Sequence, residues 1–150
     1  MNVVRTVGNS RMGDDGAGPL LAELMANAPI EGWIAVNGGS TPENVTHQIR
    51  DLKPNRLVIV DATDMELAPG EIRIVNPDDI AEMFFMSTHN MPLNFLIDQL
   101  REEIDEVIFL GIQPDVVMFY FPMTEKVTQA VNVIYQRLSI WETGEGFEHL

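Results

Sequence analysis

Short apolar runs alternate with longer amphipathic stretches along this chain, and the alternation limits the folds open to it. Five runs are apolar enough to be strands, and four stretches space their apolar residues like helices that bury one face. The expected strands lie at residues 3–7, 33–36, 56–60, 71–75 and 106–112, and the expected helices at 18–28, 42–52, 92–104 and 124–141. This order predicts an α/β three-layer sandwich, a mostly parallel twisted sheet with helices on both faces.

Three further expectations concern individual segments. The run 56–60 is apolar enough to be a central strand, and we expect the strand at 71–75, which follows a Pro-Gly turn, to pair beside it. Residues 142–150 contain two glycines and no periodicity, so we predict a flexible tail. A length of 150 residues fits one domain spanning 1–150.

Composition narrows the possible partners and chemistry. The chain has no Cys, which removes disulfides, thiolate metal ligands and a cysteine nucleophile, and it permits the reducing cytosol. A formal net charge of -14 repels phosphate backbones, so nucleic acid is a poor partner, whereas a basic peptide or a cation is favoured. The sequence shows neither a signal peptide nor an apolar run long enough to span a membrane. We therefore expect a monomeric cytoplasmic protein.

Three distant stretches each end in a residue that can bind a metal. Asp15 lies in the Gly-rich segment after the first strand, Asp61 ends the third strand, and His89 precedes the third helix. The carboxyl ends of parallel strands share one edge of a sheet, where α/β proteins place their sites. If all three stretches end at that edge, two carboxylates and an imidazole form a site for a divalent transition metal ion.

Each of these residues also has a purely structural interpretation. An Asp before a helix is commonly a cap worth about 1 kcal/mol, so either Asp14 or Asp15 could cap while the other faces the site. Asp61 could be a turn residue, although a partly buried carboxylate needs a partner or a metal. Asp64 is expected to be a solvated turn residue. We expect His47 and His149 to lie outside any site.

Other types of site have less support in the sequence. The Gly-Asp-Asp-Gly-Ala-Gly run at 13–18 lacks the spacing of a dinucleotide fingerprint, and its aspartates would repel a pyrophosphate. No Gly-Lys-Ser/Thr follows, which argues against a P-loop. No serine has an evident partner base, so a serine-type triad is not expected.

The chain resembles the hydrogenase maturation endopeptidases along its whole length. The resemblance is carried by Gly8-Asn9, the 13–18 run, Val60-Asp61-Ala62, His89 with Pro92-Leu93, and Gly111-Ile112-Gln113-Pro114. It implies a phosphorylase/hydrolase-like α/β fold. It also implies an endopeptidase that removes a C-terminal extension from the precursor of the nickel-iron hydrogenase large subunit.

The resemblance further implies that Asp15, Asp61 and His89 contact the metal and are the candidate catalytic residues. The implied ion is nickel already inserted in the substrate, although another divalent ion could occupy the site in vitro. Many members carry Gly at Thr6 and Asp at Asn37, so a scheme that needs a carboxylate at residue 37 is weakened here.

The sequence leaves the mechanism open between metal-activated cleavage and an aspartate general base. It also leaves open whether the free enzyme holds a metal. The alternative function is a non-catalytic, metal-dependent checkpoint module that binds the precursor and recruits another protease. A nucleotide-binding module is a third possibility, which the acidic loop disfavours.

Overall fold

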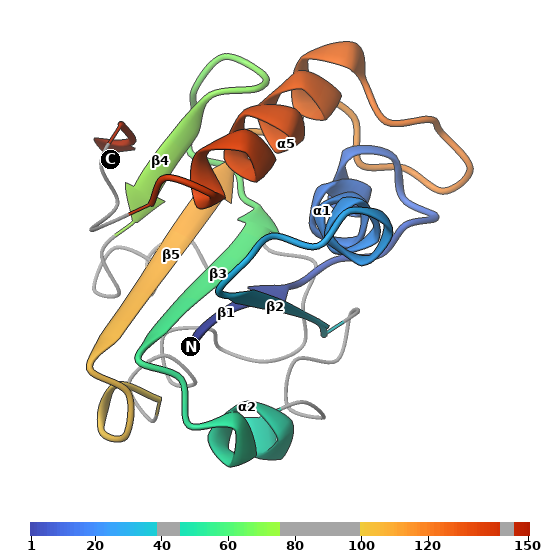
Figure 1. Ribbon diagram of the computed structural model, residues 1–150. Coiled ribbons are helices and arrows are strands. Elements are labelled where there is room, and N and C mark those ends of the chain that lie inside the picture. The colour runs from blue at the N-terminus through green and yellow to red at the C-terminus, as the bar shows by residue number, and fades with distance from the viewer. Residues whose placement is uncertain (39–45, 76–99, 142–145) are drawn as a thin grey trace.

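The computed structural model describes residues 1–38, 46–75, 100–141 and 146–150 (Figure 1). Within these residues, six strands form one sheet in the order β2-β1-β3-β5-β4-β6. The strands are β1 (Asn2–Thr6), β2 (Trp33–Asn37), β3 (Arg56–Ala62), β4 (Ile72–Val75), β5 (Glu106–Ile112) and β6 (Glu148–His149). The helices are the short 3-10 turn η1 (Gly13–Gly16), α1 (Ala17–Asn27), α2 (Thr46–Leu52) and α5 (Glu125–Leu138).

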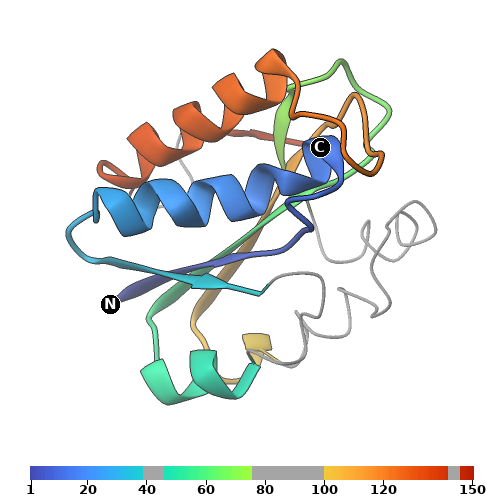
Figure 2. The ribbon, with the colours of Figure 1, turned by 90° about the vertical axis from the view of Figure 1, so that its right-hand side faces the viewer.

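The sheet is mostly parallel and carries helices on both faces, as the alternation predicts. Strands β2, β1, β3 and β5 are parallel neighbours. Figure 2 shows α1 and α5 over one face and α2 under the other. No helix among the described residues has the length and apolar character needed to cross a membrane. The expected helix at 92–104 falls largely outside the described residues.

Successive strand residues point to opposite faces, so each central strand feeds two hydrophobic clusters. Val58 and Val60 pack with α1 and α5, whereas Leu57 and Ile59 pack on the side of α2. Both clusters contain buried side chains from β1, β3 and β5. The side chain of Asp61 therefore belongs, by alternation, to the face of Leu57 and Ile59.

The expectation that residues 71–75 pair beside the third strand is wrong. Strand β3 already has β1 on one side and β5 on the other, so both its edges are filled. Strand β4 pairs instead with the outer edge of β5 and runs antiparallel to it. Parallel pairing requires a crossover, usually a helix, whereas the link from β3 to β4 contains no helix and brings the chain back in the opposite direction.

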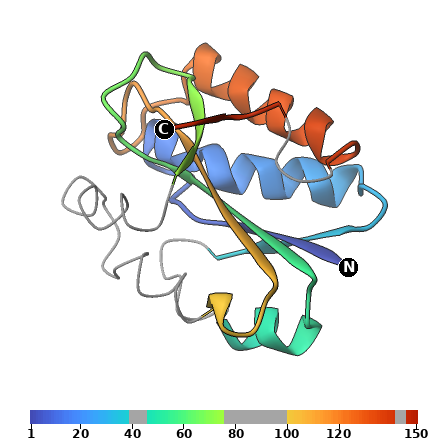
Figure 3. The same ribbon diagram turned by 90° about the vertical axis from the view of Figure 1, so that its left-hand side faces the viewer.

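The described part of the C-terminal segment is packed, in contrast to the expected flexible tail. Strand β6 pairs with β4, and the C-terminus lies beside it in Figures 1 and 3. Phe147 is buried with its ring centroid 5.3 Å from that of Trp141. The guanidinium of Arg137 lies 4.9 Å from the centre of the Phe147 ring. Phe147 thus anchors a segment whose apolar residues show no periodicity. A search for periodic patterns does not detect a single anchoring residue of this kind.

A single carboxylate joins the two long loops at the carboxyl edge of the sheet. Asp14 in η1 is fully buried and accepts hydrogen bonds from the backbone N–H groups of Asp115, Val116 and Thr124 at 2.8, 3.0 and 2.7 Å. The Thr124 hydroxyl donates to the same carboxylate at 2.9 Å. Asp14 thus binds the start of α5, more than a hundred residues away, and does not cap the neighbouring helix α1, which is one of the two roles that the sequence leaves open for it.

We predict that replacing Phe147 with Ala lowers the free energy of unfolding by about 3 kcal/mol, because the change removes a buried ring from an aromatic cluster. The change in the free energy of unfolding is measured by urea unfolding, with far-UV circular dichroism as the signal. Leu150→Ala is the matched control, since that side chain is 46% exposed and should change stability little. A loss no larger than that of the control would mean that the tail is free in solution.

Asp14→Ala should lower the free energy of unfolding by at least about 3 kcal/mol, because it removes a fully buried acceptor and leaves three backbone N–H donors without a partner. Asp14→Asn keeps one acceptor oxygen and should lose less. The exposed carboxylate of Asp115 provides the control, and Asp115→Ala should change stability by no more than about 0.5 kcal/mol. Equal effects of Asp14→Ala and Asp115→Ala in urea unfolding would contradict the bracing role of Asp14.

Candidate functional site

Asp15 is held in place by the loop that follows β1. Its side chain is almost fully buried, and its Oδ2 accepts a hydrogen bond from the backbone N–H of Asn9 at 2.9 Å. Gly8 has φ of +141°, and a Cβ there would lie 2.1 Å from the Asp15 carbonyl oxygen. The loop therefore closes tightly because residue 8 has no side chain. This explains why Gly8-Asn9 accompanies the acidic run.

Asp61 lies near the carboxyl end of the central strand β3, at the same edge of the sheet. It lies in β3 next to Gly111 of β5, one residue beyond the point where the N–H of Val7 bonds the Val60 carbonyl at 3.0 Å. The residue is 1% exposed. Turn η1, which carries Asp15, packs against β3. Two buried aspartates, 46 positions apart in the sequence, thus lie at one edge of the sheet, as predicted.

The third predicted ligand, His89, lies outside the described residues. Within residues 1–38, 46–75, 100–141 and 146–150, no group of three His, Cys, Asp or Glu side chains could hold a metal ion. The two described carboxylates supply hard oxygen ligands for a divalent ion, and a third ligand has to come from elsewhere. The three-residue site therefore stays a prediction. His47 and His149 are exposed on α2 and β6.

Asn37 ends β2 at the same edge and is coupled to Thr6. The Thr6 hydroxyl donates to the Asn37 side-chain oxygen at 3.3 Å, and the N–H of Gly38 donates to the Thr6 carbonyl at 2.8 Å. The two positions that depart from the family pattern are thus direct neighbours across β1 and β2. Asn37 also lines a groove between α1 and β2 that includes Ser10, Glu23 and Trp33.

The loop after Asp61 is held by Gln113, which the sequence marks only as part of the motif at residues 111–114. Its side-chain oxygen accepts from the backbone N–H groups of Met65 at 2.6 Å and Leu67 at 3.3 Å. Its amide nitrogen donates to Asp64 at 3.2 Å. Asp64 is half-buried and also accepts from the N–H of Glu66 at 3.1 Å, so it orders the loop and is not simply a solvated turn residue.

Arg5 is a further residue that sequence reasoning missed. It is fully buried in β1, and its register partner on β3 is Ile59, two residues before Asp61. By strand alternation Arg5 and Asp61 share one face of the sheet on adjacent strands. A single Arg inside the apolar run Val3–Val7 was the available signal, because a buried guanidinium is rare without a charged or hydrogen-bonding partner.

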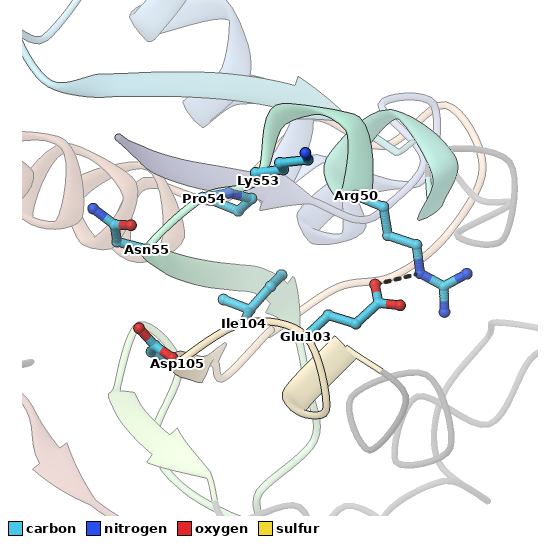
Figure 4. A pocket seen from close by; sticks show the side chains of 7 residues that line it. All are labelled: Arg50, Lys53, Pro54, Asn55, Glu103, Ile104 and Asp105. Atoms are coloured by element: carbon cyan, nitrogen blue, oxygen red, sulfur yellow. Dashed lines mark ion pairs between the residues drawn. The ribbon is translucent and has the colours of Figure 1, made fainter.

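A cavity among the described residues lies at the end of the sheet opposite the two aspartates. Its walls come from α2, the segment before β3 and the segment before β5, and an ion pair of 2.9 Å joins Arg50 to Glu103 at its rim (Figure 4). These segments precede their strands, so the cavity belongs to the amino edge of the sheet. The aspartates lie at the carboxyl edge, and the two features are separate.

Comparison with known proteins agrees with the fold and with the family that the sequence resembles. Residues 20–140 match the model of the hydrogenase maturation protease family. The hydrogenase 3 maturation protease of Escherichia coli K12 is 65% identical over 149 residues, which cover 99% of this chain and 96% of that protein.

Two solved structures are similar over nearly the full length. The solution structure of an endopeptidase from Escherichia coli superposes with a TM-score of 0.94 at 65% identity, covering 100% of this chain and 96% of the other. A nickel-iron hydrogenase maturation protease from Thermococcus kodakarensis gives a TM-score of 0.81 at 25% identity, covering 93% and 90%. This chain belongs to the hydrogenase maturation protease family.

Proposed function

We propose that this chain is the endopeptidase that removes the C-terminal extension of a nickel-iron hydrogenase large-subunit precursor after nickel insertion. The proposal rests on one observation, the pair of buried carboxylates of Asp15 and Asp61 at one edge of the sheet. The chain that carries them belongs to the hydrogenase maturation protease family. The name of the Escherichia coli relative, hydrogenase 3 maturation protease, makes the hydrogenase 3 precursor the first substrate to test.

Nickel enters this proposal as part of the substrate. Asp15, Asp61 and His89 would contact the ion in the precursor, so that cleavage follows only when the metal centre is complete. Two carboxylates and an imidazole suit a divalent transition ion, and the acidic surface of the chain favours approach of a positively charged centre. Asp15 is already oriented by the backbone of Asn9, which reduces the rearrangement needed on binding.

Cleavage itself follows one of two routes. In the first, the ion polarises the scissile carbonyl or activates water, and the aspartates act as ligands. In the second, one aspartate takes a proton from the attacking water as the new C–O bond forms, and the leaving amine is protonated as the C–N bond breaks. Asparagine variants separate these routes, since an amide oxygen can bind a metal ion but cannot accept the proton. The proposed setting is the cytoplasm and the proposed working form is a monomer.

Asp15→Ala, Asp61→Ala and His89→Ala should each reduce processing by roughly a hundredfold or more, because loss of one member misplaces the reacting groups. The assay is a gel shift of purified nickel-loaded precursor, with thermal unfolding used to verify the fold of each variant. Asp51→Ala, an exposed carboxylate on α2, should process like the unmodified protein. Near-normal cleavage by two of the three site variants would overturn the assignment.

Nickel should be needed on the substrate and not on the enzyme. Precursor from nickel-starved cells should resist cleavage, whereas enzyme treated with chelator and then desalted should still cut nickel-loaded precursor. The same gel reports both results. Equal cleavage of nickel-free precursor would rule out sensing of the metal. If the purified chain binds nickel-loaded precursor without cutting it, the chain is a checkpoint module that recruits another protease.

A further inference from the structure

A cluster of exposed apolar side chains lies in the loop between β5 and α5. Met118, Phe119, Tyr120 and Phe121 are consecutive, and they are 55%, 60%, 91% and 50% exposed. Residues 116–124 carry no charge in a chain whose net charge is -14. The other large exposed apolar residues in the described part of the chain are isolated positions in other elements, such as Ile34 and Ile140. A contiguous exposed group of this kind typically marks an interaction surface.

The backbone under this cluster is fixed against the loop that carries Asp15. The N–H of Tyr120 donates to the Arg11 carbonyl at 2.8 Å, and the N–H of Asp14 donates to the Val116 carbonyl at 2.7 Å. Gly13 adopts φ of +58°, and a Cβ there would lie 2.4 Å from the Val116 oxygen. The exposed rings are therefore presented by a braced loop whose position is tied to Asp15.

Tyr120 itself has an unfavourable backbone conformation. Its φ is +64°, in the left-handed region that a residue with a bulky side chain seldom adopts. Such a conformation persists where the surroundings enforce it, and it is concentrated at functional sites. Here it accompanies the most exposed aromatic side chain of the loop. Neither burial nor a helical or strand geometry explains the placement of this ring.

We infer that Met118–Phe121 is the surface on which the folded hydrogenase precursor docks, and this inference rests on the proposed function. The loop leaves the carboxyl end of β5, at the same edge of the sheet as the end of β3 (Figure 2). Asp61 lies at this end of β3, so a partner that reaches the aspartates also meets the exposed side chains of Met118–Phe121. The matching surface on the precursor is an apolar patch beside the cleavage segment.

The size of the cluster favours a transient substrate over a second copy of this chain. At these exposed fractions the four side chains present roughly 500 Å² of surface. A stable protein–protein interface buries about 800 Å² on each partner. The cluster alone is too small for a stable dimer, whereas an enzyme and its substrate gain the remaining contact area in the site itself.

The test is the kinetics of cleavage of nickel-loaded precursor by the double variant Phe119→Ser and Tyr120→Asn. Asn tolerates the left-handed conformation, so the backbone at residue 120 should be retained. The KM should rise at least tenfold, equivalent to about 1.4 kcal/mol, with kcat within about twofold. Ile140→Ser, at a site 77% exposed beyond α5, is the matched control and should leave both constants unchanged.

Each other outcome has a defined meaning. An unchanged KM in a folded double variant overturns the docking surface and leaves the proposed function intact. If the unmodified protein does not cleave the precursor, the proposed function fails and the docking surface fails with it. If the double variant does not fold, Tyr120→Asn alone carries the test, with a KM at least about threefold higher expected.

Two measurements address other partners for the same surface. Sedimentation equilibrium of the unmodified protein and the double variant tests self-association, and pelleting with phosphatidylcholine vesicles tests membrane binding. We expect neither to differ between the two proteins. A dimer or vesicle binding that is lost in the variant, together with an unchanged KM, would assign the cluster to that partner and overturn the inference.

Discussion

The hydrogen bonds of the buried Asp14 carboxylate organise the edge of the molecule where its candidate site lies. One fully buried side chain accepts hydrogen bonds from the segment after β5 and from Thr124, the N-cap residue of α5. A buried carboxylate is unfavourable unless its oxygens are hydrogen-bonded, and charge-assisted bonds to backbone N–H groups are strong. The positive end of the α5 macrodipole adds to this stabilisation. The loops after β1 and β5 consequently form one unit.

Two adjacent aspartates in that unit have different surroundings and different roles. Asp14 is surrounded by donors from residues 115–124, and Thr124 uses its hydroxyl on this carboxylate instead of on its own helix. Asp15 points elsewhere and is held by the N–H of Asn9. A 3-10 turn changes direction by about a third of a turn at each residue, so neighbours in it face different partners. The brace and the candidate ligand are therefore neighbours in sequence but separate in function.

The same arrangement links the proposed metal contact to the proposed docking surface. Strand β3 presents Asp61, Gln113 orders the loop behind it, and the chain after Gln113 continues to the exposed rings at 118–121. Hydrogen bonds from both loops fix these parts relative to Asp15. In this proposal a small protein recognises a large folded substrate at two places. The aspartates contact its metal centre, and the exposed side chains at 118–121 contact an apolar surface beside that centre.

The sequence by itself determined the alternation of strands and helices, and hence the mostly parallel sheet with Asp15 and Asp61 at its carboxyl edge. These features follow from local periodicity and from the chirality of crossovers, which short stretches of sequence encode. Only the tertiary structure decided that β4 pairs with β5, that Phe147 anchors the C-terminal segment, and that Asp14 braces α5. Each of these depends on contacts between residues far apart in the chain, because pairing partners and buried acceptors are selected by the space and the donors that the folded core leaves available.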